Sequence, residues 1–164
     1  MPELPEVESA RALIAGRALG RRIAEVDDSD TFVTRPHVPG EIAAALQGRE
    51  LTAAHRRGKA MWVETDGGEG PVLGLHLGMA GRILVDDEAA GDRLQGEDGA
   101  RWDRFVLRFD DGGRLSLRDK RRLGRAVLDP VLDAVGPDAA RIGRDDFRRR
   151  VGRGGAPLKA RIMD

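Results

Sequence analysis

The first residues of the chain carry the most reactive chemistry in the sequence. Pro2 follows Met1, and an initiator Met before a small residue is normally removed. Its removal would expose a proline secondary amine, which can attack an aldehyde-like carbon and form an iminium. Glu3 comes next and would place a carboxylate where it could move protons. Met-Pro starts are nonetheless common, and an acid near a helix start is ordinary, so these two residues need support from elsewhere.

Two further segments combine basic side chains with glycines. Residues 56–59 (Arg-Arg-Gly-Lys) lead into an apolar run, where Lys59 could meet a phosphate or sugar oxygen. An edge-strand lysine that discourages aggregation is the simpler alternative. In residues 76–82 (His-Leu-Gly-Met-Ala-Gly-Arg), two glycines would let a tight turn approach a ligand. His76 could then bind a phosphate and Met79 could fill an irregular gap, although a plain hairpin with a core Met also fits.

A third segment is strongly basic. Between Arg114 and Arg125 there are six basic residues and one acidic residue, a local charge of +5 in a chain of zero net charge. Such a concentration is the electrostatic footprint expected for a polyanion. Leu123 lies within this segment and could act as a wedge between bases. The alternative is that the charged run is only a solvated face.

Composition limits the other possibilities. The 164 residues include 28 basic and 28 acidic residues and 40% apolar residues, enough for one core. The absence of cysteine excludes disulfides, thiol nucleophiles and thiolate metal sites from these residues. No apolar run approaches the length of a membrane span and no signal peptide is visible. We therefore expect no membrane association and an intracellular location.

The elements that must position these residues follow from periodicity and turn residues. We expect an α+β protein: a β-sandwich of two antiparallel sheets, flanked by an N-terminal helix over 5–17 and a second short helix over 41–47. An exposed loop is expected over 86–100, where acidic residues and glycines gather. The predicted strands cover 23–26, 51–55, 59–64, 72–77, 82–85, 104–109, 114–118 and 125–128.

The composition changes after Asp129-Pro130. Residues 1–130 are predicted to form the sandwich domain, and residues 131–164 a linker and the first helices of a second domain. The helical segments expected there are 145–151 and 157–164.

Taken together, the segments resemble the formamidopyrimidine-DNA glycosylase/endonuclease VIII family. The matching pieces occur in the family's order and run nearly from end to end. They are residues 1–8, 56–59, 76–81, 119–124, 135–138 and 158–164. The resemblance places the second domain in the family's helix–two-turns–helix element.

The resemblance implies a bifunctional glycosylase and abasic-site lyase that acts on oxidised bases in damaged double-stranded DNA, as a monomer by default. It also implies a cytoplasmic protein associated with a bacterial nucleoid. Pro2 would attack the deoxyribose C1′, and β- then δ-elimination would cut the strand. Glu3 would assist opening of the sugar ring, and Glu6 would help to order the site. Lys59 and His76 would contact phosphates beside the lesion.

The resemblance also assigns the residues that hold the distorted duplex. Met79, Arg121 and Leu123 match residues that fill the gap left by an everted nucleotide. Arg121 would face the orphaned base, and Arg122 would contact a phosphate. Lys159 matches a lysine of the binding groove.

Leu123 and Lys120 depart from the family pattern, because members that act on 8-oxoguanine usually carry Phe and Pro there. The rest of the helical element, the loop that covers the flipped base and the four-cysteine zinc finger would lie beyond Asp164, so no cofactor is expected in this chain. Two alternatives remain: a DNA-damage binder without turnover, and an enzyme that uses proline as a base on small carbonyl compounds. The basic segment and the gap-filling set argue against the latter, since a small substrate needs neither.

Overall fold

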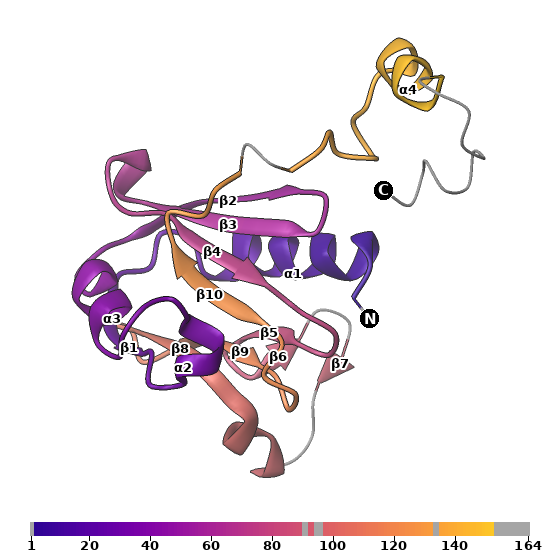
Figure 1. Cartoon of the computed structure of the whole chain (residues 1–164). Helices are drawn as coiled ribbons and strands as arrows, with labels where there is room; N and C mark the ends of the chain where they lie inside the picture. The colour runs from indigo at the N-terminus through magenta and orange to yellow at the C-terminus, as the bar shows by residue number, and fades with distance from the viewer. Residues whose placement is uncertain (1, 90–91, 94–96, 133–134, 153–164) are drawn as a thin grey trace.

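The structure is a computed structural model and describes residues 2–89, 92–93, 97–132 and 135–152. Two antiparallel sheets face each other, with the first helix beside them (Figure 1). The six-stranded sheet has the order β1 (Ile23–Asp27), β8 (Asp103–Phe109), β9 (Arg114–Arg118), β5 (Arg82–Val85), β6 (Glu88–Ala89) and β7 (Asp92–Arg93). The four-stranded sheet has the order β10 (Arg125–Leu128), β4 (Leu73–His76), β3 (Ala60–Thr65) and β2 (Leu51–Arg57). The predicted α+β sandwich is confirmed.

The core lies between the inner faces of the sheets. On β3 every second side chain is buried, as expected for a strand with one face toward a core. Phe105 of β8 has the largest of the fully buried side chains in the described residues. Leucine and valine side chains fill much of the remaining space, among them Leu73, Leu107, Leu115, Leu117, Val63 and Val85.

The helix α1 (Leu4–Arg17) positions the start of the chain. Glu3 is its N-cap residue, and the backbone N–H of Glu3 donates to Glu6 Oε2 at 3.0 Å within a capping box. The helix packs against β2 and β5, one strand from each sheet. It is held there by an apolar stripe of Val7, Ala10 and Ile14. This packing fixes the site of Pro2 at one end of the sandwich (Figure 1).

Five short elements differ from the sequence prediction. Besides the expected helix α3 (Glu41–Leu46), the structure has a one-turn helix α2 (Thr31–Thr34), capped by Asp30. The segment 86–100 was predicted to be an exposed loop, but β6 and β7 extend the six-stranded sheet there. The 3₁₀ helix η2 (Glu97–Trp102) follows β7, and η1 (Asp66–Gly68) follows β3. Elements this short have too few residues to show a period.

Beyond β10 the chain is tied back to the sandwich before it reaches α4 (Arg144–Val151). Asp138 is buried and forms an ion pair with Arg56, and its Oδ2 also accepts the Gly58 N–H at 2.7 Å. α4 stands apart from the two sheets (Figure 1). The helix predicted over 157–164 lies outside the described residues. Among the described helices, none is long and apolar enough to cross a membrane.

Glu8 links α1 to β2 and gives a pH-dependent test of this packing. Hydrogen bonds from Arg11 and then Arg56 lower its pKa from 4.5 to about 2. Glu8 therefore stabilises the fold fully above pH 4.5, and the contribution is lost as pH falls toward 2, because the unfolded chain takes up the proton first. We expect the free energy of unfolding of Glu8→Gln to fall less between pH 6 and pH 3 than that of the wild type, as measured by urea titration. The control is Glu69→Gln, at an exposed residue with no side-chain ion pair in the described part of the chain; equal acid sensitivity of the wild type and Glu8→Gln would contradict the prediction.

Candidate active site

Pro2 lies at a cavity between the start of α1 and the turn that joins β4 to β5. The proline is half-buried, and the cavity has a volume of about 560 Å³. Three of the residues predicted for the site, Pro2, Glu6 and Met79, line the same cavity. The other lining residues are mostly small or apolar, apart from Arg82 and Ser9. A secondary amine at Pro2 would therefore face a space shared with a carboxylate.

Glu3 and Lys59 are brought together beside this cavity. The Lys59 Nζ lies 2.9 Å from Glu3 Oε2, and both side chains are exposed. The sequence placed Lys59 on a strand over 59–64, and this is wrong. Lys59 lies in the two-residue turn between β2 and β3, where Gly58 has a φ of +59°. The turn carries Lys59 to the end of the sandwich at which α1 begins.

His76 is the last residue of β4 and is held by the turn that follows it. The Gly78 N–H donates to His76 Nδ1 at 3.0 Å, so the neutral ring carries its proton on Nε2. The pKa of His76 is lowered, first by partial removal of the ring from water and second by the positive charge of Lys59. His76 is therefore a neutral hydrogen-bond donor near pH 7, suited to a phosphate oxygen.

The turn over 77–81 and the loop over 119–124, hereafter the basic loop, lie against each other. His76 pairs with Arg125 in the β4–β10 ladder, which sets both segments at the same end of the sandwich. Gly78 has a φ of +58°, and a Cβ there would lie 2.4 Å from the Leu123 carbonyl carbon. Only glycine permits this approach. It places Met79 and Leu123, which are 44% and 39% exposed, on neighbouring turns.

The Asp119 side chain holds the backbone of the basic loop by hydrogen bonds. Its side chain is fully buried; Oδ1 accepts the Arg121 N–H at 2.9 Å, and Oδ2 accepts the N–H groups of Leu123 and Gly124, both at 2.7 Å. These three bonds turn the backbone around the carboxylate. The side chains of Arg121 and Leu123 are left exposed.

The basic segment is less charged than the sequence suggested. Three of its six cations are paired with carboxylates from distant parts of the chain, and Lys120 lies over the Trp102 ring at 5.5 Å. Arg121 has no side-chain hydrogen bond or ion pair within the described residues. The three pairs are Arg114–Asp87, Arg118–Asp103 and Arg122–Asp30.

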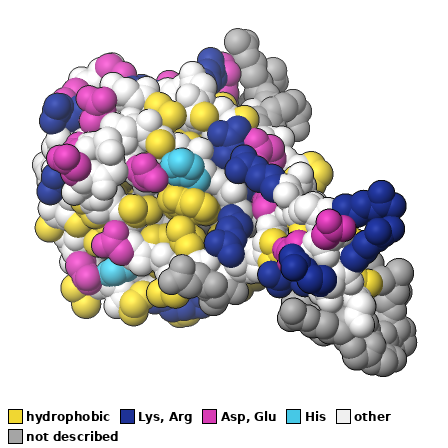
Figure 2. All heavy atoms as spheres, turned by 90° about the horizontal axis from the view of Figure 1, so that it is seen from above, with side chains coloured by type: hydrophobic (Ala, Val, Ile, Leu, Met, Phe, Trp, Pro, Cys, Tyr) yellow, Lys and Arg dark blue, Asp and Glu magenta, His cyan; other side chains and the backbone are white. Residues whose placement is uncertain are grey.

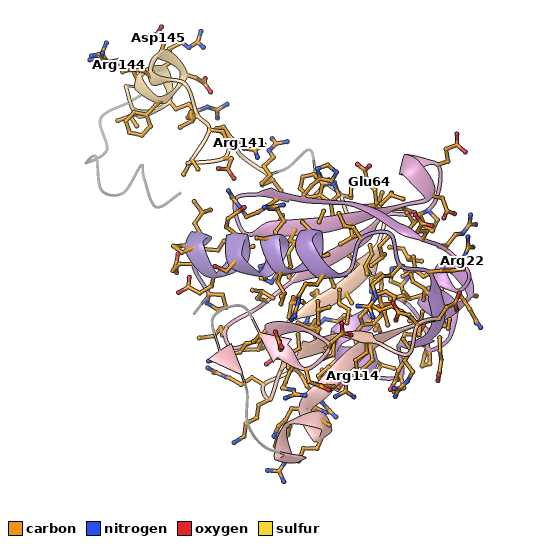
Figure 3. The ribbon with its side chains drawn as sticks, turned by 180° about the vertical axis from the view of Figure 1, so that it is seen from behind. Arg22, Glu64, Arg114, Arg141, Arg144 and Asp145 are labelled. Carbon is orange, nitrogen blue, oxygen red and sulfur yellow. The ribbon has the colours of Figure 1, made fainter. Side chains whose placement is uncertain are left out.

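A second cavity, also about 560 Å³, lies between α1, β2 and the segment that leads to α4. None of the predicted site residues lines it. Figure 2, which looks onto the structure from above, shows Lys and Arg side chains gathered between the sandwich and α4. Arg56 is paired with both Glu8 and Asp138 there, and Arg57 donates to the backbone oxygens of Val135 and Gly136. These arginines therefore fasten the segment to the sandwich. Figure 3 shows Arg144 and Asp145 of α4 pointing away from it.

The structure brings five of the predicted residues together in or beside one cavity, and it adds residues that sequence reasoning missed. Pro2, Glu6 and Met79 share the cavity, with the Glu3–Lys59 pair beside it. Lys159 lies outside the described residues. Arg82 lines the Pro2 cavity and is exposed; its place directly after Gly81 was the available signal. Asp30 and Asp119 carried no local signal.

The two facing sheets and α1 define a sandwich domain whose cavity opens at the first residues of the helix. The formamidopyrimidine-DNA glycosylase N-terminal domain model matches residues 1–126. The chain belongs to the formamidopyrimidine-DNA glycosylase family, so the resemblance inferred from the sequence is confirmed.

Relatives of the chain carry the same family name. It is 38% identical to a formamidopyrimidine-DNA glycosylase of a Nocardioides species and 37% identical to that of Chloroflexus aggregans. All of this chain is covered in both matches, but only 57% and 59% of the relatives. Among solved structures, it is similar to Lactococcus lactis Fpg (MutM) in complex with DNA containing N7-benzyl-Fapy-dG. That match has a TM-score of 0.63 and 26% identity over 77% of this chain and 43% of the other. The same Lactococcus protein with abasic-site DNA matches at 25% identity, again with a TM-score of 0.63.

Proposed function

We propose that this chain provides the catalytic part of a DNA glycosylase that removes oxidised bases and also cleaves the resulting abasic site as a lyase. The Pro2 amine would be the nucleophile. The observation that carries the proposal is the shared cavity of Pro2, Glu6 and Met79 with the Glu3–Lys59 pair beside it. A nucleophile, a carboxylate and a phosphate-binding cation at one end of a rigid domain are the groups that this reaction needs. The Lactococcus relative solved with damaged DNA supports it.

In the proposed reaction, the Pro2 nitrogen forms a bond to C1′ as the bond from C1′ to the base breaks. The base leaves with the bonding electrons and takes up a proton. Glu3 then protonates the ring oxygen as the sugar opens, which leaves an iminium between Pro2 and C1′. Loss of a C2′ proton expels the 3′ phosphate, and a second elimination expels the 5′ phosphate. Water finally hydrolyses the iminium and restores the amine.

The residues around the cavity would hold the DNA for this chemistry. Because C1′ is inaccessible in a duplex, the nucleotide must be flipped out at a cost of a few kcal/mol. Met79 and Leu123 would fill the space that it leaves, and Arg121 would face the unpaired base. Lys59 and His76 would bind phosphates, a role also proposed for Arg122 and, for the groove, Lys159. Leucine has no ring to stack on a base, so we expect a weaker wedge than phenylalanine provides.

Borohydride trapping tests this function. The full chain, with Pro2 exposed, is mixed at low salt with a duplex that contains one abasic site, and the iminium is reduced to a stable amine. We expect a covalent protein–DNA adduct, with none on an undamaged duplex. Binding of the damaged duplex without any adduct would instead support a damage-binding protein without turnover.

Arg121 gives a prediction for recognition of the opposite base. Arg121→Ala is expected to reduce the preference among the four opposite bases by roughly 1–3 kcal/mol, the usual contribution of a specific base contact. The measurement is the rate of abasic-site cleavage with each opposite base. Arg108→Ala is the matched control, because Arg108 is exposed on β8 near Glu25 and lies away from the cavity. An unchanged ranking and spread of the four rates in Arg121→Ala would refute the assignment.

A further inference from the structure

We propose that Asp30 is a positioning residue for lesion recognition, which acts through Arg122 and the base of the basic loop. This inference rests on the proposed function and adds Asp30, the N-cap residue of α2, which is not among the predicted site residues. It concerns how well the protein distinguishes damaged from undamaged duplex, whereas Pro2 concerns the bond-making step.

The two oxygens of Asp30 have separate tasks. Oδ1 accepts the Phe32 N–H at 3.2 Å and caps α2. Oδ2 lies 3.0 Å from Arg122 Nε and 3.6 Å from Arg104 Nη1. The side chain of Asp30 is only 10% exposed, and a carboxylate so far removed from water needs cations beside it. The nearly buried Asp30 carboxylate therefore holds two arginine side chains by ion pairing.

Arg104 connects Asp30 to the first residue of the basic loop, Asp119. Its Nε donates to the backbone oxygen of Asp119 at 3.0 Å. Asp119 in turn holds the loop through the three N–H groups described above, and its own N–H donates to Trp102 O at 2.9 Å. The chain of contacts from Asp30 through Arg104 to Asp119 joins α2, β8 and the basic loop.

Arg122 is held by one edge of its guanidinium. It has a φ of +55°, a backbone conformation that is unfavourable for a residue with a side chain. Its Nε lies 3.0 Å from Asp30 Oδ2 in an ion pair, while the side chain remains 48% exposed. No hydrogen bond within the described residues uses its terminal nitrogens. Asp30 thus leaves these two nitrogens available to donate to a phosphate, in the planar geometry that arginine provides.

The ion pair between Asp30 and Arg122 orders the basic loop before DNA binds. With Arg122 turned toward Asp30, its neighbours Arg121 and Leu123 remain exposed on the loop surface. A preorganised loop loses less conformational entropy when it enters the distorted duplex. Undamaged duplex, which has no gap to fill, gains little from this order. Asp30 should therefore contribute to discrimination more than to general DNA affinity.

Asp30→Asn is the sharpest variant, because its side-chain oxygen can still cap α2 while the charge is lost. The measurement is the Kd of the full chain for an abasic-site duplex and for the undamaged duplex at the same salt concentration. We expect the ratio of the two Kd values to fall about tenfold, because the ion pair between two contacting residues is lost. Binding of undamaged duplex should stay within about twofold or tighten, because the variant gains positive charge. A merely structural role would weaken both duplexes equally.

A double-mutant cycle with Arg122→Ala identifies the partner. Arg122→Ala alone should lower the ratio to a similar degree, and the double variant should show little further loss because the two residues act as a unit. Arg122→Lys keeps a cation but lacks the planar donors, so it should also lose discrimination; it serves if Asp30→Asn does not fold. Asp110→Asn, at an exposed residue after β8 with no side-chain partner in the described chain, is the control. Additive effects of the two substitutions on the Kd ratio, or an unchanged Kd ratio in Asp30→Asn, would overturn this inference but not the proposed function. A wild type that binds damaged and undamaged duplex equally well would overturn both.

Discussion

An uncleaved residue in front of Pro2 is expected to abolish adduct formation with an abasic-site duplex. The extra residue converts the proline nitrogen into an amide, whose lone pair is delocalised into the carbonyl group and cannot attack C1′. The measurement is borohydride trapping of two preparations of the same chain, one with Met1 retained and one that begins at Pro2. We expect trapping to fall to the level seen on undamaged duplex, while binding to the damaged duplex is retained.

Pro2→Gly separates the amine from the ring. Glycine still supplies a primary amine, but it lacks the secondary amine and the restricted backbone of proline, so we expect trapping about tenfold slower, one power of ten being about 1.4 kcal/mol of barrier. Ser9→Ala, which changes another residue of the same cavity, is the matched control and should trap normally. An undiminished adduct from the chain with a blocked amine would place the nucleophile elsewhere. Lys59 would then be tested next, since its Nζ lies beside Glu3.

Asp119→Ala is expected to have the largest effect on stability. The substitution leaves the N–H groups of Arg121, Leu123 and Gly124 without their acceptor. Water can reach part of the loop, so we expect the free energy of unfolding to fall by about 3 kcal/mol rather than by the full penalty for three buried donors. Urea unfolding measures this loss, and it should be accompanied by weaker discrimination of the abasic-site duplex.

Two variants calibrate that result. Asp119→Asn keeps one acceptor oxygen and should lie between Asp119→Ala and the wild type. Asp110→Ala removes an exposed aspartate that has no side-chain partner in the described residues, and it should change the free energy of unfolding by less than about 0.5 kcal/mol. If Asp119→Ala were no less stable than Asp110→Ala, the hydrogen bonds to the loop would contribute little to the fold.

Much of the fold could be predicted from local patterns. The strands expected over 82–85, 114–118 and 125–128 match β5, β9 and β10, since alternating apolar residues and turn residues are visible along a single segment. Helix α1 was predicted because Pro5 and the apolar stripe act within a few turns. The elements that were missed, α2, β6, β7 and the 3₁₀ helices η1 and η2, contain two to six residues. Their formation depends on the neighbouring sheet and helix rather than on their own periodicity.

The site was predictable to the extent that its residues lie in short segments. The quoted segments led to Pro2, Met79 and Lys59, and the structure places these at one end of the sandwich. Ion pairs between distant residues, such as Arg122 with Asp30, are chosen by the packing of the two sheets, and nothing in either segment indicates them. For that reason the sequence overestimated the free positive charge of the basic segment between Arg114 and Arg125. Lys59 was predicted to begin a strand because Gly58 alone did not indicate that the turn includes both Gly58 and Lys59.

The connections at the Pro2 end have one further consequence. β4 and β10 belong to the four-stranded sheet, whereas β5 and β9 belong to the six-stranded sheet, so the turn that carries Met79 and the loop that carries Leu123 both pass from one sheet to the other. A core substitution that widens the spacing between the sheets, such as a larger side chain at a buried leucine, would shift both connections in concert. Distant core residues can therefore tune how deeply Met79 and Leu123 penetrate a duplex without any change in the residues that touch it.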